Sequence, residues 1–133
     1  NDTHPAFAAS SVFILDTIGQ LMNYYAVCDI AFVGGSLVKK GGHNIIEPAA
    51  CAKPVVFGPY MFNFRDITDL YLKNNAAVMA GSIGELKDKI RYLLENEAES
   101  LALGNRAKAL INRNKGATAR NLEYISGFLK RGG

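Results

Sequence analysis

Short runs of consecutive apolar residues alternate along this chain with longer segments in which apolar residues recur every three or four positions. The short runs are rich in valine, isoleucine and phenylalanine, which is typical of buried strands. They lie at residues 12–15, 30–33, 55–57 and 77–79. This alternation predicts βαβ units, and hence an α/β fold with a parallel sheet and helices on both of its faces.

The segments between and after these runs have the apolar spacing of helices. The predicted helices cover about residues 21–27, 44–51, 63–73, 83–94, 97–112 and 117–130. Asn63 can cap the third helix, and Ser82 followed by Glu85 has the form of a capping box at the start of the fourth. Gly116 is expected to separate the last two helices.

The composition is that of an ordinary globular chain without a nucleic-acid signature. Of its 133 residues, 49% are hydrophobic, and 15 basic against 12 acidic residues give a net charge of +3, which suits an anionic small ligand. No apolar run reaches the ~20 residues that a membrane-spanning helix needs. Cys28 and Cys51 lack the spacing of metal ligands, so we expect reduced thiols and no bound metal. The chain does not begin with Met, and we interpret it as a piece of a longer protein.

The turns that follow the strands are where ligand-binding residues are expected. In a parallel sheet with right-handed crossovers the carboxyl ends of the strands share one edge, and α/β folds bind their ligands there. Residues 34–42 follow one strand and contain two glycine pairs, Gly34-Gly35 and Gly41-Gly42. Glycine lets the backbone approach a ligand closely, and a helix starting directly after such a loop offers free N–H groups to an anion. The pattern predicts a site for a phosphate-bearing small molecule.

Four side chains near these glycines could contact the ligand. Glu47 could accept hydrogen bonds from two adjacent ribose hydroxyls, although the helix dipole alone also favours a carboxylate at a helix start. Ser36 could hold a phosphate with its hydroxyl or be an ordinary turn residue. His43 could donate a hydrogen bond to a departing phosphate, and Asn44 could bind phosphate or cap the helix. A single histidine without a recognisable partner does not argue for a nucleophilic triad.

Further candidates surround this centre. Lys39 and Lys40 could meet an anionic group of the ligand or be solvated loop charges. Arg65 could reach an anion, whereas helix capping is the stronger interpretation for Asn63. The turn after the first strand consists of Asp16, Thr17, Ile18 and Gly19. Its backbone could contact a nucleotide base, or it could simply start a helix with the aspartate as cap.

Several motifs occur in order and together resemble one family. They are Gly34-Gly35-Ser36, Gly41-Gly42-His43-Asn44, Glu47-Pro48, Lys53-Pro54, Phe57-Gly58-Pro59 and Asn63-Phe64. The set is similar to the donor-binding half of the 3-deoxy-D-manno-octulosonic acid (Kdo) transferases, which are GT-B glycosyltransferases of Gram-negative lipopolysaccharide synthesis. Residues 15–21 fit as well, except that Gln20 stands where the family more often has Glu. The resemblance covers roughly residues 10–130.

The resemblance implies a Rossmann-like parallel sheet that forms the C-terminal half of a GT-B fold and lacks its first strand or strands. Residues 1–133 would be a single nucleotide-sugar-binding domain, without the N-terminal acceptor domain. No metal or other cofactor is implied. The implied donor-binding residues are Asp16, Thr17, Ile18, Gly19, Gly34, Gly35, Ser36, Gly42, His43, Asn44 and Glu47, with Lys39, Lys40, Asn63 and Arg65 as possible additions.

The implied reaction is transfer of Kdo from CMP-Kdo to a lipid A precursor, with inversion at the anomeric carbon, at the cytoplasmic face of the inner membrane. In the family the catalytic base is an acidic residue of the N-terminal domain, so no catalytic residue is expected in this chain. We therefore expect the chain alone to bind cytidine nucleotide weakly and to transfer nothing.

Two alternative functions stay open. One is the donor domain of a GT-B enzyme that uses a different nucleotide sugar, such as a UDP-sugar transferase or epimerase. The other is a Rossmann-like binding module with no catalytic partner domain. A dinucleotide-dependent oxidoreductase is disfavoured, because no G-x-G-x-x-G motif follows a strand.

Overall fold

A parallel three-stranded sheet lies at the centre of the molecule. The computed structural model describes the backbone of residues 12–131 and the side chains of residues 12–114. The strands follow one another in the order β1 (Ala31–Phe32), β2 (Val55–Phe57) and β3 (Val78–Met79). Val56 of the central strand lies opposite Phe32 on one side and Val78 on the other. The α/β class and three of the four predicted strands are confirmed.

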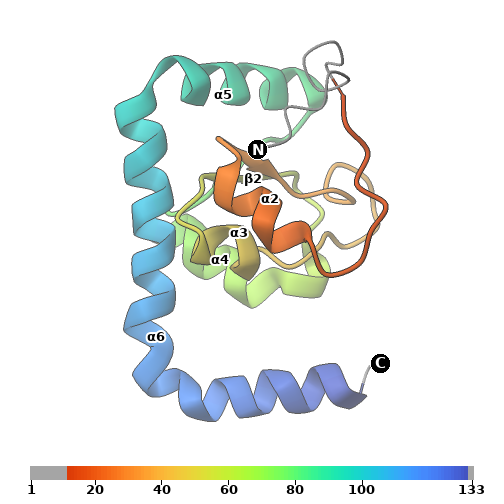
Figure 1. Ribbon diagram of the computed structural model, residues 1–133, viewed down its shortest axis with the longest axis vertical. Coiled ribbons are helices and arrows are strands. Elements are labelled where there is room, and N and C mark those ends of the chain that lie inside the picture. Colours follow the sequence, from red (N-terminus) through yellow and green to blue (C-terminus); the bar gives the residue numbers. More distant parts are fainter. Residues whose placement is uncertain (1–11, 132–133) are drawn as a thin grey trace.

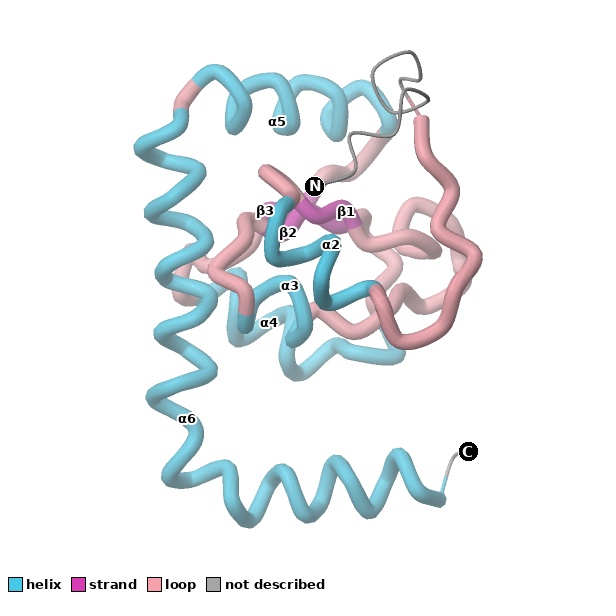
Figure 2. Tube along the Cα trace, viewed as in Figure 1, coloured by secondary structure: helices cyan, strands magenta, loops and turns pink. Residues whose placement is uncertain are grey.

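Helices surround this sheet in the described part of the chain. They are α2 (Leu21–Val27), α3 (Ile46–Ala50), the 3₁₀-helix η1 (Phe62–Phe64), α4 (Arg65–Lys73), α5 (Ile83–Glu95) and α6 (Glu97–Arg131). In Figure 1, α5 lies on one side of the sheet and α3 and α4 on the other, while α6 runs along one end. Figure 2 shows the short strands together at the centre, with the loops that connect them to α3 and α4 gathered at one end of the sheet.

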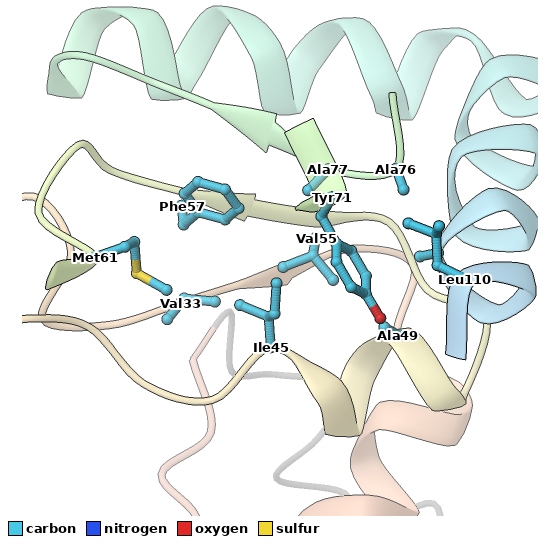
Figure 3. Packing of buried hydrophobic residues seen from close by; sticks show 11 residues of the cluster. Val33, Ile45, Ala49, Val55, Phe57, Met61, Tyr71, Ala76, Ala77 and Leu110 are labelled. Carbon is cyan, nitrogen blue, oxygen red and sulfur yellow. The ribbon is translucent and has the colours of Figure 1, made fainter. Parts of the chain in front are cut away.

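Alternate residues of β2 face two hydrophobic clusters, one on each side of the sheet. Val55 and Phe57 face the larger cluster, whose helical members come mainly from α3, α4 and α6 (Figure 3). Val56 faces the smaller cluster, which includes Leu93 of α5 and Leu103 of α6. All three β2 residues are buried, as expected for a central strand covered by helices on both faces.

The predicted strand at residues 12–15 is wrong. The sheet consists of β1, β2 and β3, and residues 12–15 do not belong to it. Val12 and Ile14 are 76% and 81% exposed. A segment joins a sheet only through backbone hydrogen bonds with a neighbouring strand, and the described sheet pairs β1 with β2 and β2 with β3. The apolar run alone could not reveal this, because it contains no information about its partner.

The C-terminal helices also differ from the prediction. Residues 97–131 form the single helix α6, so Gly116 does not interrupt it. One glycine inside a helix costs only about 1 kcal/mol relative to alanine, which a long helix tolerates. The helix changes direction in its C-terminal part (Figure 1). No helix in the described range has both the length and the hydrophobicity to cross a membrane.

Two of the helix starts were predicted from capping patterns, with different outcomes. Ser82 caps α5 as predicted, since its hydroxyl accepts a hydrogen bond from the Glu85 N–H (3.2 Å). The Glu85 carboxylate accepts in turn from the Gly81 N–H (2.7 Å). Asn63 does not cap α4, because Phe64 occupies the N-cap position; the Asn63 side chain donates a hydrogen bond to the Lys40 carbonyl oxygen (3.4 Å).

Candidate functional site

Two loops lie side by side at the carboxyl edge of the sheet. The glycine loop, residues 34–44, leads from β1 towards α3, and the second loop, residues 58–63, leads from β2 towards α4. Because β1 and β2 are parallel neighbours, the loops that leave their carboxyl ends are adjacent. Most of the candidate residues predicted from the sequence lie in the glycine loop and at the start of α3.

The second glycine pair packs against the second loop. Gly41 and Gly42 have φ angles of +92° and +75°, which other residues rarely adopt. A Cβ atom on Gly41 would overlap the Asn63 side chain, and one on Gly42 would overlap the sulfur of Met61. The Gly42 N–H donates a hydrogen bond to the Gly35 carbonyl oxygen (3.1 Å). Gly42 is therefore required by the loop itself, and its N–H is not free to bind a ligand as predicted.

The first glycine pair is open to a ligand. Gly34 is exposed, and a Cβ atom built there would meet nothing within 4 Å. The Nε2 atom of the exposed His43 lies 3.7 Å from the position that a Cβ of Gly35 would take. Within the described residues, the N–H groups of Gly34, Gly35 and His43 donate no hydrogen bond. These groups and the imidazole could bind one anion together.

Asn44 and Glu47 lie at the start of α3. The Asn44 Oδ1 atom accepts a hydrogen bond from the Ile46 N–H (3.0 Å), which forms a turn directly before α3, whose N-cap position is Ile45 and not Asn44. Glu47 is exposed in the first turn of α3. Burial raises the pKa of Tyr25 in α2, and the nearby negative charge of Glu47 raises it further. Because Glu47 is exposed, its carboxylate could accept hydrogen bonds from ligand hydroxyls.

Ser36 faces the interior, which corrects its predicted contact with a phosphate. The residue is fully buried. Its hydroxyl donates a hydrogen bond to the Val33 carbonyl oxygen (2.5 Å) and accepts one from the Gly58 N–H (2.8 Å). Because the single hydroxyl hydrogen is used inside the fold, the side chain cannot donate to a ligand in this conformation.

The turn at residues 16–19 is exposed and leads into α2. The Thr17 hydroxyl donates a hydrogen bond to the Gln20 side-chain oxygen (3.1 Å), and Gly19 has a φ angle of +86°. Asp16 makes no capping hydrogen bond, because Gln20 occupies the N-cap position of α2. Among the described residues no hydrogen bond joins this turn to the glycine loop, so its predicted contact with a base stays a prediction.

A cavity of about 200 Å³ lies on the other side of the second loop. It is bounded by the second loop, the start of α4 and the end of β3, and Arg65 and Asp69 are its charged lining residues. Arg65 forms no ion pair among the described residues. Lys39 and Lys40 do not line this cavity and are exposed in the glycine loop. The sequence did not predict that Asp69 lines this cavity, because a residue one helical turn after Arg65 has the pattern of an ordinary surface position.

The remaining reactive side chains include two cysteines. Cys28 and Cys51 are free and partly buried, and burial raises the pKa of the Cys28 thiol, which disfavours a reactive thiolate. The residues with described side chains contain no cluster of three His, Cys, Asp or Glu that could hold a metal ion. The arrangement at the sheet edge is suited to binding an anionic, hydroxyl-bearing ligand.

Comparison with known proteins identifies the family. The family model described as "Glycosyl transferases group 1" matches residues 7–110. The chain belongs to this family. The assignment agrees with the parallel sheet, the glycine loop at its carboxyl edge and the short helix that follows.

The relatives of this glycosyl transferase chain include several Kdo transferases. It is 37% identical over 123 residues to the 3-deoxy-D-manno-octulosonic acid transferase of Haemophilus influenzae, which covers 92% of this chain and 29% of the relative. It is 36% identical over 118 residues to the enzyme of the same name from Bordetella pertussis, covering 89% and 28%. The chain thus spans less than a third of the length of these curated relatives.

A solved structure resembles this glycosyl transferase chain in both sequence and fold. It is the C-terminal CMP-Kdo binding domain of WaaA from Acinetobacter baumannii, with 34% identity and a TM-score of 0.74. The match covers 78% of this chain and 54% of that chain. The predicted likeness to Kdo transferases and the predicted fold, that of a GT-B C-terminal domain, are therefore confirmed.

Proposed function

We propose that this chain is the donor-binding domain of a Kdo transferase and that its ligand is CMP-Kdo. The observation that carries the proposal is the match to a domain described as binding CMP-Kdo, with 34% identity and a TM-score of 0.74 over 78% of the chain. The longer protein would transfer Kdo to a lipid A precursor at the cytoplasmic face of the inner membrane. Residues 1–133 would supply donor binding, and a separate domain would bind the acceptor.

In this proposal the nucleotide binds across the glycine loop and the start of α3. The N–H groups of Gly34 and Gly35, with the imidazole of His43, hold the phosphate. They stabilise the negative charge that develops on the departing CMP. The Glu47 carboxylate accepts hydrogen bonds from the ribose hydroxyls, which is a strong interaction because the acceptor is charged. The support comes from their shared position at the carboxyl edge and their exposure.

The sugar acid is proposed to occupy the cavity beside the second loop. A guanidinium binds a carboxylate through two parallel hydrogen bonds, and Arg65 lines this cavity without an ion-pair partner in the described chain. Asp69, one helical turn further on, would accept hydrogen bonds from the sugar hydroxyls. Lys39 and Lys40 would add positive potential around the phosphate from the exposed loop.

The base that deprotonates the acceptor hydroxyl is proposed to lie outside this chain. Glycosyl transfer requires such a base as well as a stabilised leaving group. Glu47 is assigned to the ribose in this proposal and is not available as the base. The chain would therefore bind the donor without completing the reaction.

Calorimetric titration with CMP and with UDP tests this function. We expect CMP to bind more tightly than UDP. Glu47→Gln should weaken CMP binding about tenfold, because hydrogen bonds to a charged acceptor contribute roughly 1.5–3 kcal/mol. Glu97→Gln is the matched control, since Glu97 is also an exposed glutamate in the first turn of a helix. A clear preference for UDP would instead support the donor domain of a UDP-sugar enzyme.

A further inference from the structure

The second loop is hydrogen-bonded to the glycine loop at the buried residue Ser36. The Ser36 hydroxyl accepts a hydrogen bond from the Gly58 N–H (2.8 Å), and the Ser36 carbonyl oxygen accepts one from the Tyr60 N–H (2.9 Å). Gly58 approaches so closely that a Cβ atom on it would overlap the Ser36 backbone. The start of the second loop therefore cannot move without moving Ser36.

A second pair of hydrogen bonds joins the two loops at the exposed end of the second loop. The Asn63 N–H donates a hydrogen bond to the Gly41 carbonyl oxygen (3.2 Å), and the Asn63 side chain donates to the Lys40 carbonyl oxygen (3.4 Å). Gly41 and Gly42 lack a Cβ where Asn63 and Met61 press against them. The hydrogen bond between Gly58 and Ser36 joins residues 22 positions apart in sequence, and that between Asn63 and Lys40 joins residues 23 positions apart. Both contacts therefore depend on the tertiary fold.

The part of the glycine loop that is open to a ligand adjoins these two points in sequence, since Gly34 and Gly35 precede Ser36 and His43 follows the second glycine pair. The hydrogen bond from the Gly42 N–H to the Gly35 carbonyl oxygen (3.1 Å) closes the loop there. Through this bond a displacement of Gly41 and Gly42 reaches Gly35 and the imidazole of His43. The orientation of the free N–H groups is thus set from outside the glycine loop.

We propose that Ser36 and Asn63 are positioning residues that act through the second loop. They contact no ligand themselves, and they hold Gly34, Gly35 and His43 in the conformation that binds the nucleotide phosphate. The identity of that ligand rests on the proposed function, whereas the coupling of the two loops does not. The role of Asn63 replaces the helix cap that its sequence position predicts.

Asn63→Ala tests the inference without disturbing the core, because Asn63 is exposed. We expect CMP binding to weaken about fivefold, the factor carried by one hydrogen bond of ordinary net strength, and the Gly42 amide to exchange its hydrogen faster by a similar factor. Exchange at Val33, whose N–H donates to Val56 in the sheet, should stay unchanged. The melting temperature should match that of Asn96→Ala, the control, which also removes an exposed asparagine that donates to a backbone carbonyl.

Ser36→Ala provides the second variant. It leaves the buried Gly58 N–H without an acceptor, so we expect both a lower melting temperature and faster exchange at Gly42. Unchanged exchange at Gly42 in Asn63→Ala would overturn the coupling of the loops. Faster exchange with unaltered CMP affinity would overturn the positioning role. If the unaltered chain binds no CMP, the proposed function fails, and exchange at Gly42 alone decides whether the loops are coupled.

Discussion

At the scale of single residues, Tyr71 stands out because it places a polar hydroxyl group inside the hydrophobic core. Its side chain is 2% exposed and lies within the larger hydrophobic cluster (Figure 3). Among the described residues its hydroxyl has no hydrogen-bond partner. Loss of contact with water raises the pKa of Tyr71 to about 12. A buried hydroxyl without a partner destabilises the folded state.

We expect Tyr71→Phe to raise the free energy of unfolding by about 1 kcal/mol, because it removes an unpaired buried polar group and keeps the ring. Urea denaturation measures this change. Tyr92→Phe is the control, since Tyr92 is 54% exposed and its hydroxyl already reaches water. A loss of stability in Tyr71→Phe would mean that the hydroxyl has a partner after all.

The same residue gives a prediction for alkaline pH. The folded state raises the pKa of Tyr71 from 10.0 to about 12, so it favours the neutral hydroxyl. This contribution to stability is fully present below pH 10 and is lost as the pH rises towards 12. The unaltered chain should therefore lose stability more steeply over this range than Tyr71→Phe does. If the free energy of unfolding fell equally with pH in the two proteins, the raised pKa of Tyr71 would be contradicted.

Residue identity predicted which side chains are exposed near the glycine loop less well for Ser36 than for Glu47 and His43. Glu47 and His43 are exposed at the predicted edge, whereas Ser36 is turned into the interior. A serine after a glycine pair has the same sequence pattern in both cases. Its role is decided by the Gly58 N–H, which approaches from another loop. Such a partner is invisible to reasoning along the chain.

At the scale of secondary-structure elements, α6 is held by a close contact at a glycine. Gly104 is buried, and a Cβ atom on it would overlap the backbone of Ala52 in the turn after α3. Arg106, further along α6, donates a hydrogen bond to the Asn75 carbonyl oxygen (2.6 Å) beyond the end of α4. The helix thereby joins two connections that lead into neighbouring strands.

Gly104→Ala should lower the free energy of unfolding by about 1–3 kcal/mol, the usual cost of forcing extra volume into a packed site. Gly84→Ala is the matched control in α5, where a Cβ atom meets only the Ser82 hydroxyl at 3.8 Å. There the higher helix propensity of alanine should add up to about 1 kcal/mol. Thermal unfolding should therefore show a lower melting temperature for Gly104→Ala and a higher one for Gly84→Ala than for the unaltered chain. Equal effects at the two positions would contradict the close contact.

The success of element prediction depended on whether the signal was local. The Ser82 cap and the apolar runs of β1, β2 and β3 were recognised because their patterns lie within a few residues. The run at residues 12–15 has an equally apolar pattern, but a strand also requires a partner. Asn63 precedes a helix as a cap would, but Phe64 is the N-cap residue and the Asn63 side chain donates to the Lys40 carbonyl oxygen. Neither outcome is encoded in the few residues around the pattern.

At the scale of the whole molecule, the sheet topology explains why the candidate loops lie at one edge. A parallel sheet brings every strand's carboxyl end to one edge, so loops far apart in sequence become neighbours. The glycine loop, the second loop and the cavity near Arg65 share this edge. In the proposed function one ligand lies along this edge, and the base for the acceptor belongs to another domain.

We therefore expect the 133-residue chain to form no product when incubated with CMP-Kdo and a lipid A precursor. Mass spectrometry of the lipid fraction measures this directly. The control is a full-length Kdo transferase under the same conditions, which should transfer the sugar. Product formed by the chain alone would show that the base lies within it.

In the proposed function the glycine loop and Glu47 hold a cytidine nucleotide at the carboxyl edge of the sheet. Titration of the ¹⁵N-labelled chain with CMP, followed by amide chemical shifts, tests it most directly. We expect the largest shift changes at residues 34–36 and 43–47, with smaller ones at residues 16–19. Changes confined to α5 and α6, with the glycine loop unaffected at saturating CMP, would contradict it.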